Sequence, residues 1–119
     1  MPNQRRPTPG LDRITAMVDL MRGPAFSVID RLEGSKFSTP EFIEVLLTDP
    51  DASAAYAEAI GHWGESEHAA KMVVHGQVVP AILRDAPGVE WLGFAHGVTD
   101  PYAVPAWWRL VREGDATDR

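Results

Sequence analysis

Hydrophobic residues recur at helical spacing along the first part of the chain. The stripe within Leu11–Arg22 repeats at i, i+3, i+4 and i+7, which predicts an amphipathic helix. Gly23 and Pro24 follow, and this pair is typical of a helix end. Because proline is well tolerated in the first turn of a helix, we expect a second helix over Pro24–Glu33.

The stretch Phe37–Trp63 carries the strongest local signals and predicts two short helices joined by a tight turn. Ser38 and Glu41 have the spacing of a capping box, in which each side chain accepts a hydrogen bond from the other residue's backbone N–H. Asp49 and Pro50 repeat the pattern of a cap followed by proline, and start the second of these helices. The apolar faces of both helices need other elements to pack against.

A further helix is expected from Ser66 to about Arg84. Pro80 lies within it, removes a backbone hydrogen bond and clashes with the preceding turn, at a cost of about 3 kcal/mol. We therefore predict a kink, or a break near Gly76 with Pro80 starting a final turn.

After this helix the hydrophobic period changes from helical to two. Val89–Ala95 and Ala106–Arg112 are rich in aromatic and branched residues, which predicts two strands. Residues 96–105 are too many for a tight hairpin turn and predict a wing-like loop. The expected fold class is α+β, mostly α, with four to five short helices followed by a C-terminal two-stranded β-hairpin.

Length and composition predict one domain. With 119 residues and 45% apolar residues, the chain can build a core, which we expect over residues 11–112, between a flexible N-terminal tail, 1–10, and a polar C-terminal tail, 113–119. The sequence shows no bilayer-spanning run, no signal-peptide pattern and no cysteine, so we expect a cytoplasmic protein without disulfides. The preference for arginine over lysine, with abundant alanine, indicates a GC-rich source such as an actinobacterium or its phage.

The net charge of −6 lowers the expectation of nucleic-acid binding, because phosphates are neutralised by lysine and arginine. Between Phe37 and Ala103 the only Lys or Arg residues are Lys71 and Arg84, whereas acidic residues are frequent. A phosphate-binding surface would have to combine these two cations with those near the ends of the chain.

The histidines do not have the spacing of a metal site. His62, His68 and His75 are six and seven residues apart, whereas zinc sites use tighter motifs with three or four converging ligands. Ser66 and His68 are two residues apart on a helix, so their side chains do not face each other. No glycine-rich phosphate loop is present, and we expect no enzyme, no metal and no cofactor.

Helices followed by a hairpin with a long loop resemble the winged helix-turn-helix architecture. The residues that carry the resemblance are the Phe37–Trp63 helix pair, the segment His68–Gln77, and the strand patterns Val89–Phe94 and Trp107–Val111. In such domains the helix before the hairpin enters the major groove and the wing touches the DNA backbone. The resemblance implies a small DNA-binding or transcription-regulatory protein that binds double-stranded DNA. The residues that it places at DNA are His68, Lys71, His75, Gln77, Arg84, Arg109 and Arg112.

The acidic face of the helices supports a second interpretation, a protein-interaction module. An adaptor, or an inhibitor that mimics DNA, would present carboxylates to a basic protein partner. Neighbours on a strand point to opposite faces, so one of the two adjacent tryptophans is expected at a surface. Self-association into a homodimer is considered in addition to the DNA and protein partners. The residues of this interpretation are Glu41, Glu44, Asp51, Glu58, Trp107 and Trp108.

Overall fold

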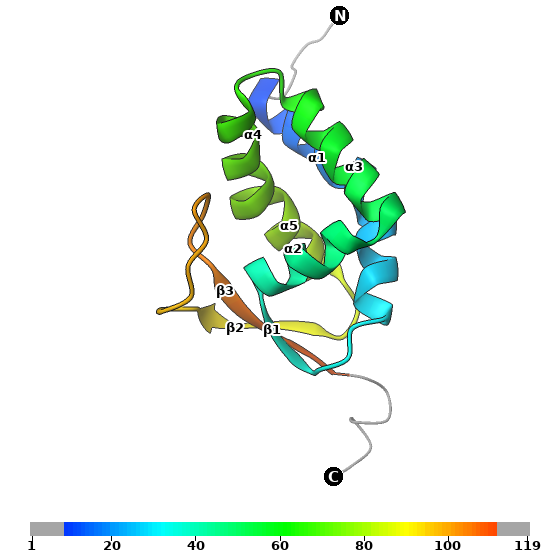
Figure 1. Cartoon of the computed structure of the whole chain (residues 1–119), viewed down its shortest axis with the longest axis vertical. Coiled ribbons are helices and arrows are strands. Elements are labelled where there is room, and N and C mark those ends of the chain that lie inside the picture. Colours follow the sequence, from blue (N-terminus) through cyan, green and yellow to red (C-terminus); the bar gives the residue numbers. More distant parts are fainter. Residues whose placement is uncertain (1–8, 112–119) are drawn as a thin grey trace, which may run out of the picture.

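A layer of helices packs on one face of a small antiparallel sheet (Figure 1). The computed structural model describes residues 9–111, with side chains from residue 13 onward. The elements in chain order are α1 (Pro9–Asp30), β1 (Lys36–Ser38), α2 (Thr39–Thr48), α3 (Pro50–Trp63), α4 (Glu67–Val73), the π-helical segment η1 (Val74–Val78), α5 (Val79–Asp85), β2 (Val89–Phe94) and β3 (Ala106–Leu110). The predicted α+β class, mostly α, is confirmed. No helix in the described part is both long and apolar enough to cross a bilayer.

The first helix is one continuous element, and the prediction of two helices separated at Gly23 and Pro24 is wrong. Helix α1 continues through both residues to Asp30. Its buried stripe extends past the proline, because Ala25 and Val28 are as deeply buried as the residues before it. Packing along this face, largely against α3 beside it in Figure 1, outweighs the hydrogen bond that the proline removes.

Both predicted N-terminal caps are confirmed. The Ser38 hydroxyl accepts from the backbone N–H of Glu41 at 3.3 Å, and the Glu41 carboxylate accepts from the N–H of Ser38 at 2.8 Å. Asp49 accepts from the N–H of Ala52 at 2.8 Å and caps α3. The N–H groups of Ser38 and Glu41, which have no partner within the helix, are thus satisfied by the cap itself.

The third strand was not predicted from the sequence. The sheet has the order β1-β3-β2, so the hairpin partner β3 becomes the central strand. Phe37 in β1 pairs with Trp108 in β3, and Trp108 pairs on its other side with Trp91 in β2. The short β1 was hidden because it has three residues and its last one, Ser38, is also the cap of α2.

Trp108 lies at the centre of the core and is fully buried. Its indole Nε1–H donates to the hydroxyl of Thr39 at 2.8 Å, and that residue is the first of α2. The same hydroxyl lies 3.4 Å from the backbone N of Ala106. One buried hydroxyl therefore joins the central strand to the helical layer.

Replacing Thr39 with valine removes this hydroxyl at nearly constant shape. We expect Thr39→Val to lower the free energy of unfolding by roughly 1–3 kcal/mol, because the indole N–H of Trp108 loses its acceptor inside the core. Urea unfolding followed by tryptophan fluorescence measures this change. The control is Thr48→Val, since the exposed Thr48 hydroxyl bonds only the carbonyl of Val45 within its own helix. Equal stability of the two variants would contradict the role of Thr39.

The cap of α3 also makes stability depend on pH. The N–H of Ala52 and then the guanidinium of Arg31 hold the pKa of Asp49 below its ordinary value of 3.8. This contribution is present above the unfolded pKa and is lost as pH falls through the lower folded pKa. We expect Asp49→Asn to reduce the loss of stability below about pH 4, measured as Tm against pH. Asp51→Asn is the control, and identical pH profiles for the two variants would exclude the effect.

Candidate interaction surface

The segment between β2 and β3 folds back against the helices and does not project as a free wing. It rises alongside α4 in Figure 1. A Cβ atom added at Gly76 in η1 would lie 3.3 Å from the Cβ of Ala103 in this loop, so the two backbones approach closely. Tyr102 stacks near His68 and His75, with ring centroids 5.4 and 4.9 Å away. We call residues 95–105 the returning loop.

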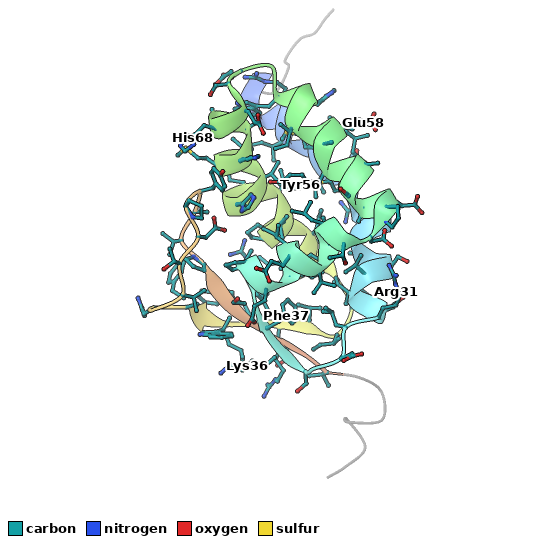
Figure 2. The ribbon with its side chains drawn as sticks, viewed as in Figure 1. Arg31, Lys36, Phe37, Tyr56, Glu58 and His68 are labelled. Carbon is teal, nitrogen blue, oxygen red and sulfur yellow. The ribbon has the colours of Figure 1, made fainter. Side chains whose placement is uncertain are left out.

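A buried chain of hydrogen bonds fixes the returning loop to two helices. The Tyr56 hydroxyl lies 2.8 Å from Nε2 of His75, and Nδ1 of His75 lies 2.9 Å from the Asp100 carboxylate. The other carboxylate oxygen of Asp100 accepts from the N–H of Tyr102 at 2.9 Å. A carboxylate only accepts, so in the neutral ring Nδ1 donates to Asp100 and Nε2 accepts from Tyr56. Figure 2 shows Tyr56 pointing from α3 towards the α4–α5 side of the core.

The irregularity expected near Gly76 is a π-helical segment, η1, rather than a break: the helix continues through it into α5, with Pro80 in the first turn of α5. One extra residue in a turn rotates the following side chains by about 100°. His75 comes two turns after His68 and lies beside the same Tyr102 ring, and it is buried rather than on an exposed face.

The order hydroxyl, imidazole, carboxylate is also that of a hydrolytic triad, but its environment differs from one. The side chains of His75 and Asp100 are 9% and 3% exposed, which leaves little access for a substrate. Burial raises the pKa of Tyr56, which disfavours a phenolate nucleophile. The geometry fits an anchor for the returning loop. A shallow cavity of about 270 Å³ lies beside His75 and Asp100, and its lining includes Ile43, Leu47 and Pro101.

The residues that the winged-helix resemblance places at DNA do not form one surface. Lys71 pairs with Glu67 at 3.0 Å, and Arg109 pairs with Glu90 at 2.6 Å. Arg84 lies over the ring of Trp108 on the helix side of the sheet, whereas the register places Arg109 on the opposite side. The exposed members of the set are His68, Gln77, Arg84 and Arg109, His75 is buried, Lys71 is half-buried, and Arg112 lies outside the described residues.

The acidic residues of the second interpretation are on the surface, but its two tryptophans differ. Trp108 is fully buried and offers no contact surface. Trp107 is half-buried on the other face of the sheet, where the ammonium of Lys36 lies 4.6 Å from its ring centroid. Figure 2 shows Lys36 on the side of the sheet away from the helices. Exposed carboxylates come from α2 and α3: Glu41, Glu44, Asp51 and Glu58.

A cluster of exposed apolar side chains on the hairpin was missed by the sequence analysis. The hairpin patch is the contacting pair Trp91 and Phe94, and Leu92 and Val104 are further exposed apolar side chains of the segment that follows α5. Trp91 is 47% exposed and Phe94 57%, and their rings meet edge to face at 5.5 Å. The sequence marked these aromatics as strand residues. Periodicity does not show whether a strand lies at an uncovered edge, so no local signal could have found the patch.

Comparison with family models, curated proteins and solved structures found no match. Within residues 13–111, no cluster of three or more His, Asp or Glu side chains is placed to hold a metal ion. The winged-helix resemblance therefore rests on architecture alone.

Removing the Asp100 carboxylate tests the anchor. We expect Asp100→Ala to lower the free energy of unfolding by roughly 1–3 kcal/mol, because His75 Nδ1 and the N–H of Tyr102 lose their acceptor. Amide hydrogen exchange at Tyr102 should accelerate more than exchange in α2. Thr99→Ala is the control, since this neighbouring side chain is exposed. Unchanged exchange at Tyr102 would show that the loop is held by packing alone.

Proposed function

We propose that this protein is a small non-enzymatic protein-binding module of winged-helix-like architecture. The observation that carries the proposal is the hairpin patch, in which large aromatic side chains are left half-exposed beside a well-packed core. Aromatic residues at a surface are the usual centres of protein interfaces, because each buries a large area with few rotatable bonds. A contiguous exposed apolar cluster is typical of an interaction site.

The state of the basic side chains supports a protein partner over DNA. Five cations of the described region are already within 4.0 Å of a carboxylate: Arg13, Arg22, Arg31, Lys71 and Arg109. Lys36 and Arg84 lie over tryptophan rings on opposite faces of the sheet. Strong DNA binding needs several free cations aligned along the phosphates, and each one here would first have to leave its present partner.

The acidic side chains on α2 and α3 supply the electrostatic part of the proposal. They are exposed, and the chain carries a net charge of −6, so encounters with basic protein surfaces are favoured over encounters with nucleic acid. In this proposal the patch provides affinity and the carboxylates provide orientation. The proposal keeps the cytoplasmic location expected from the cysteine-free sequence.

A double substitution of the patch tests the function. We expect the wild-type chain to retain a specific protein from a lysate of the source organism, and Trp91→Ser/Phe94→Ser to lose at least about nine-tenths of it, since interface aromatics contribute 2 kcal/mol or more. Quantitative mass spectrometry of crosslinked eluates provides the measurement. Val45→Ser is the matched control, because it removes an equally exposed apolar side chain from α2. Thermal unfolding checks that all variants are folded.

Two results would contradict the proposal. One is equal retention of every captured protein by the wild type and the double variant. The other is salt-sensitive binding of duplex DNA, measured by fluorescence anisotropy, that is weakened by Arg84→Ala and Lys71→Ala but not by the patch substitutions. This second result would assign the protein to the DNA-binding class.

A further inference from the structure

The helical layer leaves part of the sheet uncovered. Directly paired residues of antiparallel strands lie on the same face, so Trp91 shares a face with Trp108, and Phe94 shares a face with Ala106. The two β3 residues are buried beneath the helices, whereas their β2 partners are about half exposed. Trp108 is covered by Thr39 at the start of α2 and by the Arg84 guanidinium of α5, whereas the rings of Trp91 and Phe94 are left about half exposed. The architecture therefore has room for one more element beside α5, on top of β2.

Arg84 marks the border of this uncovered area. Its guanidinium lies 5.9 Å from the ring centroid of Trp108, the residue that pairs with Trp91. The side chain is exposed and has no carboxylate partner among the described residues. The nearby acids are engaged elsewhere: Asp85 pairs with Arg22, and Glu90 pairs with Arg109. An apolar surface with one free cation at its edge is complementary to an apolar stripe flanked by a carboxylate.

We propose that the hairpin patch binds an amphipathic helix of a partner protein, which lies beside α5 and directs an acidic side chain to Arg84. This inference rests on the proposed function and names its partner. Apolar residues four positions apart on such a helix are separated by about one turn, or about 5.4 Å along its axis. The ring centroids of Trp91 and Phe94 are 5.5 Å apart, so one apolar stripe meets both rings.

The strand geometry favours a helix over an added strand. The pairing of β2 with β3 shifts register between Trp91 and Gly93, and Gly93 has a φ of 126°. A bulge of this kind twists an edge strand and interrupts the row of groups that another strand would pair with. The rings of the patch also stand on the face of the sheet, where a helix packs.

Charge favours a different protein over a second copy of this chain. In a symmetric dimer about the patch, the same surface of each copy would face the other. Each Arg84 guanidinium would then lie at the rim of an apolar contact without an acidic partner, because Asp85 and Glu90 are paired with Arg22 and Arg109. A partner helix that carries aspartate or glutamate supplies the missing carboxylate.

Selection of helical peptides on the intact protein tests this inference. The probe is a displayed library of peptides of about 18 residues, long enough for a stable helical stripe. We expect selected binders to show apolar residues at helical spacing with a flanking acid. Trp91→Ser and Phe94→Ser should each weaken a selected peptide by about tenfold or more, measured by anisotropy. Arg84→Glu should weaken it about fivefold, and exchange of the peptide acid for lysine should restore binding to that variant.

The control for the charge reversal is Lys36→Glu, on the opposite face of the sheet, which should leave peptide affinity unchanged. Because Arg84 is exposed, its variant remains informative if a patch substitution unfolds the chain. Binders with alternating apolar residues, or self-association that Phe94→Ser abolishes, would overturn the helix while leaving the proposed function standing. A selection with no binder would count against the inference, as would binders whose affinity is unchanged by the Trp91, Phe94 and Arg84 substitutions. If the patch substitutions also leave the capture of lysate proteins unchanged, the proposed function is excluded as well.

Discussion

The position of Trp108 is the constraint on which the rest of the fold depends. Its ring fills the space between the sheet and the helices, and its single polar atom is satisfied only by Thr39 at the start of α2. A buried indole N–H without an acceptor is costly, so the start of α2 must lie directly over the central strand. The capping box then fixes the direction in which α2 leaves that point. The Arg84 guanidinium of α5 lies over the same ring.

Local signals allowed the helices to be predicted where each end is encoded by its own residues. Ser38, Glu41 and Asp49 act within three residues of their partners, and these caps appear in the structure as expected. Pro24 carries an equally strong local signal, yet it misled, because the stripe buried against α3 keeps the helix continuous. The failure shows tertiary packing overriding a preference worth about 3 kcal/mol.

Less of the candidate site than of the fold could be predicted from the sequence, because its features depend on which elements pack against each other in the folded protein. The contact of His75 with Asp100 joins residues 25 apart and depends on the returning loop packing against the helix that carries His75. The exposure of Trp91 depends on which part of the sheet the helices leave uncovered, although the composition of β2 is that of an ordinary core strand. The charge balance, in contrast, is a property of the sequence, and it already weakened the DNA-binding interpretation.

The π-helical segment η1 changes the direction in which the buried face of α5 points relative to that of α4. With η1 in place, α4 turns towards the returning loop, while α5 turns its buried face towards the sheet. In a regular helix of the same length, the face of α4 that packs on the returning loop and the face of α5 that packs on the sheet would point in directions fixed by the helical repeat. Such a helix could pack well against the loop or against the sheet, but not against both. Loss of one residue from Val74–Val78 would bring the two halves back into phase. A one-residue insertion or deletion in η1 therefore disturbs the packing of α4 and of α5 together, whereas one at an exposed position of the returning loop disturbs neither helix.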